Sequence, residues 1–360
     1  MKALATLAVA AAAHLPILAP QNWWPVFSPD GGKVAFTQVS GRTMTLEVVD
    51  RATKRTVRIA ANQSQLSPSW SSDGRLAFSL GGRIYTSDAN GANRAAVTSA
   101  GHSYAPAWRP HSTDVAYLTT VGATNTDLWV SGTLWARDAI GNPAWSPDGT
   151  QLAFERDDGI YVTTGPGAER RVASIANPRR PAWSPDGRTI AYFAAKRIWL
   201  VAAEGSSAPH AVVSAGTYVT SDPIWTPDGT AIVYETGAGV WLRTLDGHTS
   251  RLHSAIVAGA SVSSLDGAIA FTAPHPGCGH TAILLDRGGH VSTLAGTCEI
   301  DGTPGNDVIE GTGLIVAGAG NDTIRAHNGH RDTILCGAGR DTVYADRSDV
   351  LRGCEIVHRP

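Results

Sequence analysis

The sequence predicts an all-β protein: a seven-bladed β-propeller followed by a small parallel β-roll at the carboxyl end. One phrase, close to Pro-x-Trp-Ser-Pro-Asp-Gly with an apolar triplet after it, occurs seven times at intervals of 37 to 43 residues. That period, with several short strands in each unit, is typical of propeller blades. From residue 298 onward the texture changes to short Gly-Asp repeats, which predict the roll. A six-bladed ring is the alternative, because the seventh copy is degenerate.

The first twenty residues read as a signal peptide or an N-terminal anchor. Lys2 precedes an alanine-rich apolar stretch that is too short to anchor well in a bilayer, and cleavage after Ala13 would follow a run of small residues. No later segment approaches the ~18 apolar residues of a spanning helix. We therefore expect an extracellular or cell-envelope location, periplasmic in a Gram-negative cell, with no membrane span beyond this segment.

Residues 21–297 are expected to form the propeller. In the fifth copy, four strands are expected at residues 181–184, 189–193, 197–202 and 210–213. Pro185-Asp186-Gly187 would turn the first hairpin, because Pro presets φ, Asp bonds nearby amides and Gly accepts a positive φ. The seven copies begin at Pro25, Pro68, Pro106, Pro143, Pro181, Pro223 and Ser261.

Two residue types recur at fixed points of the copies. An aromatic ring would fill the wedge between neighbouring sheets, in preference to forming a surface platform for sugars or peptides. A recurring aspartate is interpreted first as a turn residue. The rings are Phe27, Trp70, Trp108, Trp145, Trp183 and Trp225, and the aspartates are Asp30, Asp73, Asp148, Asp186, Asp228 and Asp266.

The Trp-Ser-Pro-Asp-Gly phrase with its apolar follower resembles the repeat of TolB-like propellers, which is also seen in the propeller domains of prolyl-oligopeptidase relatives. The resemblance covers residues 25 to about 297. It implies a fold and says little about activity, because propellers host binding, lyase and peptidase-associated roles alike. The third copy departs from the pattern at Arg109-Pro110-His111, and the seventh lacks both the Trp and the second Pro.

Residues 298–360 carry the repeats GTPGNDVI, AGAGNDTI, NGHRDTI and CGAGRDTVY. They resemble the nonapeptide of RTX, or hemolysin-type, calcium-binding proteins, in which a glycine turn and an aspartate bind calcium and the apolar remainder is a strand. The resemblance implies calcium as the cofactor, at one or two weak sites. The candidate ligands are Asp307, Asp322, Asp332 and Asp341.

The spacing of the aspartates predicts how they share the roll. Successive repeats alternate between two edges, so Asp322 and Asp341 should lie on one edge, joined by Asp307, while Asp332 and Asp349 lie on the other. An equally open interpretation is that these aspartates only satisfy turn amides, and that a disulfide supplies the order that calcium gives longer rolls.

Four cysteines fall into two close pairs: Cys278 with Cys298, and Cys336 with Cys354. In an exported chain disulfides are the default, and pairing of neighbours is the most economical of three arrangements. Beside the first pair, His275 and His280 complete a set of zinc-type ligands. Their spacing matches no familiar zinc finger, so a disulfide is the simpler interpretation.

Charge and motifs restrict the function classes. A formal net charge of -2, from 29 basic and 31 acidic residues, offers no global field for nucleic acid. The sequence has no Gly-x-Ser-x-Gly elbow and no phosphate-binding glycine loop. We therefore expect a non-catalytic exported protein that binds a protein or a cell-envelope polymer. The alternative is a polysaccharide lyase or hydrolase that uses His or Asp residues of the central funnel.

Overall fold

The computed structural model describes residues 21–40, 43–62, 66–99, 101–122, 125–213, 219, 222–253, 260–263, 266–275, 279–285, 290–295, 300–302, 305–311 and 313–360. Within these ranges every regular element is a β-strand. The expected signal segment, residues 1–20, lies outside them. Over the part of the chain that is described, no helix has the length and apolarity needed to cross a membrane.

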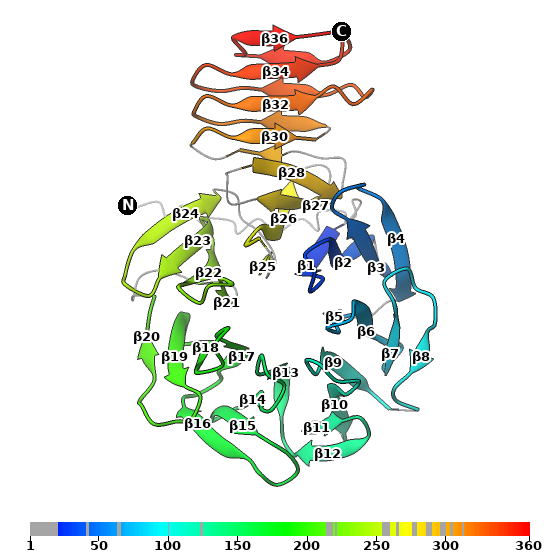
Figure 1. Cartoon of the computed structure of the whole chain (residues 1–360), viewed down its shortest axis with the longest axis vertical. Coiled ribbons are helices and arrows are strands. Elements are labelled where there is room, and N and C mark those ends of the chain that lie inside the picture. Colours follow the sequence, from blue (N-terminus) through cyan, green and yellow to red (C-terminus); the bar gives the residue numbers. More distant parts are fainter. Residues whose placement is uncertain are drawn as a thin grey trace, which may run out of the picture.

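The strands form seven four-stranded antiparallel blades around a central axis, with the first strand of each blade innermost (Figure 1). Blade one comprises β1 (Gln21–Phe27), β2 (Lys33–Ser40), β3 (Thr43–Asp50) and β4 (Thr56–Asn62). Blade two comprises β5 (Ser69–Trp70), β6 (Arg75–Leu80), β7 (Arg83–Asp88) and β8 (Ala95–Ala96). Blade three comprises β9 (Ser103–Trp108), β10 (Val115–Val121), β11 (Asn125–Val130) and β12 (Thr133–Ala136).

The other four blades follow in chain order. Blade four comprises β13 (Ile140–Trp145), β14 (Leu152–Arg156), β15 (Gly159–Thr163) and β16 (Arg170–Ser174). Blade five comprises β17 (Arg179–Trp183), β18 (Thr189–Ala194), β19 (Arg197–Ala202) and β20 (His210–Ala211). Blade six comprises β21 (Ile224–Trp225), β22 (Ala231–Thr236), β23 (Gly239–Thr244) and β24 (Thr249–His253). Blade seven comprises β25 (Ala260–Val262), β26 (Ile269–His275), β27 (Gly279–Leu285) and β28 (His290–Ala295). The degenerate seventh copy thus forms a blade, and the seven-bladed prediction is confirmed over the six-bladed alternative.

The repeated aspartates are turn residues, as the sequence predicts. In blade five, Asp186 Oδ1 accepts hydrogen bonds from the Ser184 hydroxyl at 2.6 Å and from the Arg188 amide at 3.1 Å. These two bonds hold the pKa of Asp186 below its ordinary value. Gly187 completes the turn with a φ of 71°, a left-handed conformation that glycine adopts without strain.

The repeated rings fill the space between blades, and four of them also donate a hydrogen bond that the repeat pattern does not predict. The indole Nε1 of Trp183 donates to the carbonyl of Ala144 in the preceding blade at 2.9 Å, and that of Trp225 donates to Ala182 at 3.0 Å. Trp70 and Trp145 make the same bond to the blade before them. Each of these rings is therefore fixed both by burial and by a directional contact.

Contacts between complete blades close the ring. Blades one and seven each contain four consecutive strands, so among the described strands none is exchanged between them. Phe27 and Phe36 of blade one form a buried cluster with Ala270 and Leu284 of blade seven. The rim of this seam carries an ion pair between Arg51 and Asp266, 2.9 Å between Nη2 and Oδ2.

The carboxyl end forms a two-sheet roll that continues blade seven. One sheet of eight strands runs from β25 through β28 into β30 (Val308–Glu310), β32 (Thr323–Ala326), β34 (Thr342–Ala345) and β36 (Ile356–His358). The second sheet holds β29 (Ile300–Asp301), β31 (Leu314–Val316), β33 (Thr333–Leu335) and β35 (Val350–Arg352). All pairings within the roll, and that of β28 with β30, are parallel. A parallel roll after an antiparallel propeller is the predicted order.

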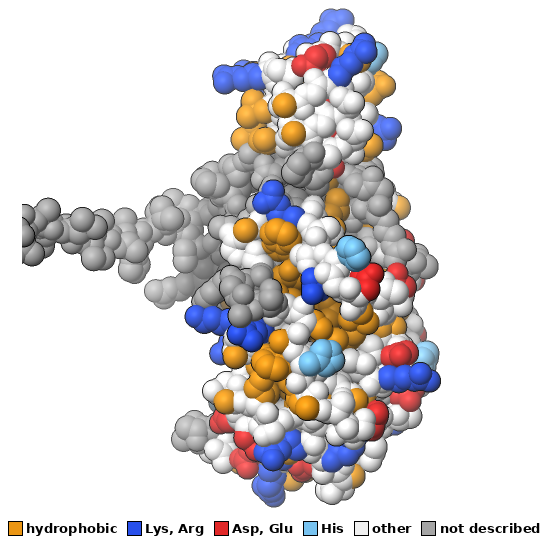
Figure 2. All heavy atoms as spheres, turned by 90° about the vertical axis from the view of Figure 1, so that its left-hand side faces the viewer, with side chains coloured by type: hydrophobic (Ala, Val, Ile, Leu, Met, Phe, Trp, Pro, Cys, Tyr) orange, Lys and Arg blue, Asp and Glu red, His pale blue; other side chains and the backbone are white. Residues whose placement is uncertain are grey.

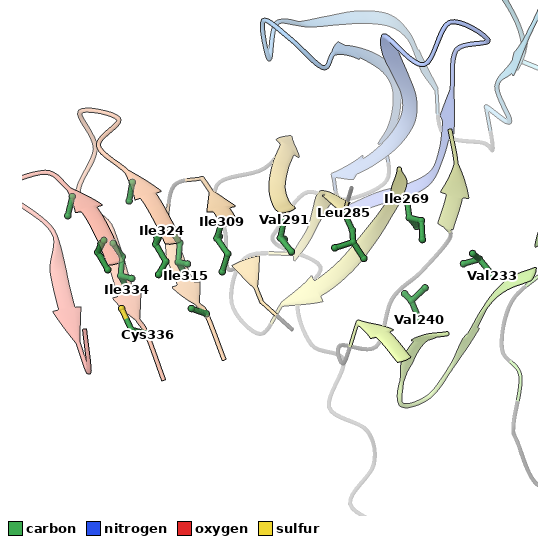
Figure 3. Packing of buried hydrophobic residues seen from close by; sticks show 14 residues of the cluster. Val233, Val240, Ile269, Leu285, Val291, Ile309, Ile315, Ile324, Ile334 and Cys336 are labelled. Carbon is green, nitrogen blue, oxygen red and sulfur yellow. The ribbon is translucent and has the colours of Figure 1, made fainter. Parts of the chain in front are cut away.

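A continuous core joins the roll to the propeller. Leu285 and Val291 of blade seven lie in line with Ile309, Ile324 and other buried residues of the roll (Figure 3). At the far end Cys336 and Cys354 form the predicted disulfide, with 5.2 Å between their Cα atoms. The other predicted pair, Cys278 and Cys298, lies outside the described residues, as do the side chains of the adjacent histidines.

Candidate functional site

The four aspartates predicted to bind calcium lie on the two edges of the roll, in the arrangement that their spacing predicts. On one edge, Asp322 Oδ1 accepts the amide of Asp307 at 2.9 Å, and Asp341 Oδ1 accepts the amide of Asp322 at 2.8 Å. On the other, Asp349 Oδ1 accepts the amide of Asp332 at 2.9 Å. Each carboxylate thus bonds the neighbouring turn, and the two edges carry aspartate ladders.

Glycines allow the turns of the first ladder to stack closely. Gly339 has a φ of 144°, and a Cβ at this position would lie 1.6 Å from the carbonyl oxygen of Gly320 one turn away. No side chain fits there. The Gly-x-Gly-x-Asp spacing therefore serves to bring successive turns within hydrogen-bonding distance, with the aspartates directed inward.

Two carboxylate oxygens of the first ladder have no partner. Oδ2 of Asp322 and Oδ2 of Asp341 are buried, and neither has a hydrogen bond within the described part of the chain. Burial, assisted by the nearby Asp307 and Asp341 carboxylates, raises the pKa of Asp322 to about 6, although the amide of Asp307 opposes the rise. An unpaired buried carboxylate is costly, so this position favours a proton or a cation.

The first ladder offers the type of ligand that calcium prefers, but its carboxylates supply only part of the number that calcium needs. Carboxylate oxygens are the hard donors that Ca²⁺ prefers, and it takes six to eight of them. Among the described residues, however, no group of three or more His, Cys, Asp or Glu side chains could hold a metal. Asp322 and Asp341 would supply two ligands, and backbone carbonyls of the glycine turns would have to supply the rest.

A second set of charged residues links three blades where the innermost strands begin. Arg180, at the start of β17, pairs with Asp222, just before β21, at 2.8 Å between Nη1 and Oδ2. Glu155, on β14, accepts the backbone amide of Arg180 and, at 3.4 Å, that of Asn142. Glu155 is fully enclosed, whereas about a third of each of the other two side chains is exposed. We call Glu155, Arg180 and Asp222 the mouth triad.

The local backbone explains why a carboxylate is needed at this point. The pairing of β17 with β18 shifts register between Arg179 and Ala182, and Arg180 adopts a left-handed φ of 48°. Such a bulge removes the Arg180 amide from the ladder of the sheet, and Glu155 accepts it. Gly141 provides the space, since a Cβ there would lie 2.0 Å from Glu155 Oε2.

Burial is the largest influence on the pKa values of Glu155 and Asp222. It raises the pKa of Glu155 to about 7, even though the amides of Arg180 and Asn142 favour the charged form. Burial also raises the pKa of Asp222, against the attraction of Arg180. The triad is therefore a polar group that ties blades four, five and six together and exposes one ion pair.

This triad was not predicted from the sequence, where histidines and turn aspartates were the candidate site residues. A signal was present in the repeats: Glu155 and Glu235 follow the apolar triplet of copies four and six, where copy five has Phe193. A charge at a repeated core position marks a buried polar contact. Two histidines of the chain, His210 and His253, lie on the outermost strands β20 and β24, away from the central funnel.

An apolar cleft lies at the opposite ends of the innermost strands, across blades five, six and seven. Its volume is about 360 Å³. Trp183 and Trp225 end their strands there, and Pro185 and Pro227 follow in the turns. Ile224 and Val262 complete the apolar lining together with Ala182 and Pro223.

Comparisons with known proteins agree on the propeller. No family model matches the chain. It is 32% identical over 99 residues to the TolB homolog of Chlorobium chlorochromatii (strain CaD3), a stretch that is 26% of this chain and 22% of that relative. A protein described as TolB from Agrobacterium tumefaciens superposes with a TM-score of 0.50 at 18% identity, over 71% of this chain and 89% of that one. The propeller is similar to TolB in this stretch of sequence and in its fold.

The TolB-like propeller also shares its fold with an enzyme. An oligogalacturonate lyase in complex with manganese superposes with a TM-score of 0.57 at 15% identity, over 74% of this chain and 89% of the lyase. Both structural likenesses show the fold alone. The sequence match spans about a fifth of the length of the curated relative.

Proposed function

We propose that this chain is an exported, non-catalytic interaction protein that holds a segment of a partner protein in the apolar cleft of blades five to seven. The cleft is the observation that carries the proposal. Binding sites are concave, mostly apolar and largely preformed, and interface energy concentrates in aromatic and aliphatic anchors that fill such pockets.

The walls of the cleft are rigid before any partner arrives. The rings of Trp183 and Trp225 are held by hydrogen bonds to the preceding blades, and Pro185 and Pro227 have fixed φ angles. Little conformational freedom would be lost on binding, which favours affinity. Ile224 is a half-buried residue of the lining, and it could contact an apolar side chain of the partner.

Two further parts of the proposal concern location and calcium. The signal pattern of residues 1–20 and the TolB-like fold support export to the periplasm or the cell surface. The unpartnered oxygens of Asp322 and Asp341 support one weak calcium site, which would remove the repulsion between neighbouring carboxylates and order the roll. Backbone carbonyls would complete the coordination.

The competing proposal is an enzyme acting on a polysaccharide, and the lyase likeness keeps it in view. The mouth triad argues against it, because its acidic groups are already engaged. Asp222 is paired with Arg180, and Glu155 accepts two backbone amides. Purified protein that cleaved an envelope polysaccharide in a metal-dependent reaction would overturn the non-catalytic part.

Site-specific photo-crosslinking in the producing cell tests the cleft directly. A photoreactive residue replaces Ile224 in one strain and Val121, an exposed side chain on β10 of blade three, in the other. We expect a discrete protein adduct from position 224 that is missing from position 121. Identical adducts from both positions, or none from position 224, would contradict the proposal.

A further inference from the structure

The outer face of the long sheet of the roll brings three exposed side chains into one row. Arg325 on β32 pairs in register with Tyr344 on β34, which pairs in register with His358 on β36. Their neighbours Ile324 and Val343 point into the core, so these three point outward. Neighbouring strands are about 4.8 Å apart, which sets the pitch of the row.

Few large hydrophobic side chains of the described residues are as exposed as Tyr344. It is 42% exposed, and the three other large hydrophobic side chains of comparable exposure in the described ranges are Val121, Leu245 and Val357. Its ring stacks on His358, with 4.7 Å between centroids and 14° between planes. That contact holds one face of the ring in place, while no other ring or guanidinium of the described residues lies against Tyr344.

The arginines of the roll form no ion pair with an Asp or Glu side chain of the described residues, whereas eight arginines of the propeller do. Arg347 donates instead to an oxygen of Pro360 at 3.0 Å, and Arg359 donates to two backbone carbonyls. All six are exposed: Arg325, Arg331, Arg340, Arg347, Arg352 and Arg359. The ladders explain the difference, because they turn the aspartates of the roll inward. Figure 2 shows the result as basic side chains over the free end of the roll.

The surroundings of the row are rich in hydrogen-bond donors. Thr323 and Thr342 stand in register in the adjacent column of the same face and are half-buried. Glu310 on β30 is the acid in register with Arg325, and no ion pair joins these two side chains. Its charge acts on Lys54 of blade one, where burial lowers the pKa of the lysine and Glu310 opposes that change. Arg325 is thus available to an external anion.

We propose that this face binds an acidic polysaccharide, with a sugar ring against Tyr344 and its carboxylate on Arg325. A guanidinium binds a carboxylate through two parallel hydrogen bonds, and the ring of Tyr344 offers an apolar face for a sugar ring. The regular row of a rigid sheet suits a polymer of repeating units. The site is separate from the propeller cleft, so either proposal can fail without the other.

Calorimetric titration of the full-length protein tests this surface. The probes are a hexamer of galacturonic acid and a neutral galactose hexamer. We expect the acidic hexamer to bind at least tenfold more tightly. Arg325→Gln and Tyr344→Ala should each weaken it at least fivefold, and Tyr344→Phe should retain the affinity.

Arg331→Gln is the matched control, because Arg331 is equally exposed and unpaired but lies on a turn at the edge of the roll. It should leave the affinity within twofold. An equal loss in Arg331→Gln and Arg325→Gln would show diffuse attraction and overturn the site. Equal binding of both hexamers, or binding of neither, would overturn it too. Thermal unfolding of each variant checks the fold, and should Tyr344→Ala be unstable, the Tyr344→Phe and Arg325→Gln results still decide.

Discussion

Replacing Glu155 by Gln should stabilise the protein at alkaline pH and leave it nearly unchanged at acidic pH. Burial raises the pKa of Glu155 from its ordinary value of 4.5 to about 7. Between these values the folded state binds more protons than the unfolded state, so its stability falls as the pH rises through this window. Below pH 4.5 the penalty vanishes, and above pH 7 it is fully present.

The magnitude follows from the shift in proton affinity. A rise from 4.5 to about 7 corresponds to roughly 3 kcal/mol, since a tenfold change in proton affinity is worth about 1.4 kcal/mol. Gln keeps a side-chain oxygen that accepts the amides of Arg180 and Asn142, and it cannot ionise. Any cost of its amide group applies equally at both pH values.

Urea unfolding at pH 5 and at pH 8 measures this effect. The free energy of unfolding of Glu155→Gln, minus that of the wild type, should be larger at pH 8 than at pH 5 by roughly 2 to 3 kcal/mol. Glu204→Gln is the control, because Glu204 lies exposed on a turn of blade five and should show no such gain. A difference for Glu155→Gln that does not change with pH would refute the account of the mouth triad.

Three further predictions concern the roll and the seam. Gly339→Ala should destabilise the roll by at least about 2 kcal/mol in urea unfolding, because the added Cβ would overlap a backbone carbonyl. Gly329→Ala is the control and should cost about 1 kcal/mol or less, because the added Cβ would meet no atom within 4 Å. Calcium at 1 mM should raise the melting temperature of the full chain, and the double variant Asp322→Asn with Asp341→Asn should remove the rise; an unchanged rise would exclude this site. Arg51→Met should lower the free energy of unfolding, measured in urea, by about 1 kcal/mol, because it removes an ion pair across the seam whose Asp266 partner is partly exposed.

The blades were predictable because the residues that determine each blade lie within a single copy of the repeat. The Pro-Asp-Gly turn, the strand alternation and the aromatic wedge all lie within one copy. Blade seven forms despite losing its Trp, because Asp266 and Gly267 still turn the hairpin before the apolar run that begins at Ala268. The spacing of Asp322 and Asp341 likewise placed them on one edge of the roll.

Contacts between distant residues could not be predicted in the same way. Arg51 and Asp266 are 215 residues apart, and no repeat relates them. The pairing of β28 with β30, which makes the roll an extension of blade seven, depends on the last strand of a blade offering a free edge. For that reason the calcium test uses the full chain, because a fragment of the roll alone would lack the strand on which it is built.

The proposal of a protein-binding cleft is tested most directly by calorimetry with the partner segment identified by crosslinking. The account predicts that Ile224→Arg weakens binding at least tenfold, since the charged side chain would enter the apolar cleft, while Val121→Arg leaves it unchanged. Equal affinity of the wild type and Ile224→Arg would contradict it.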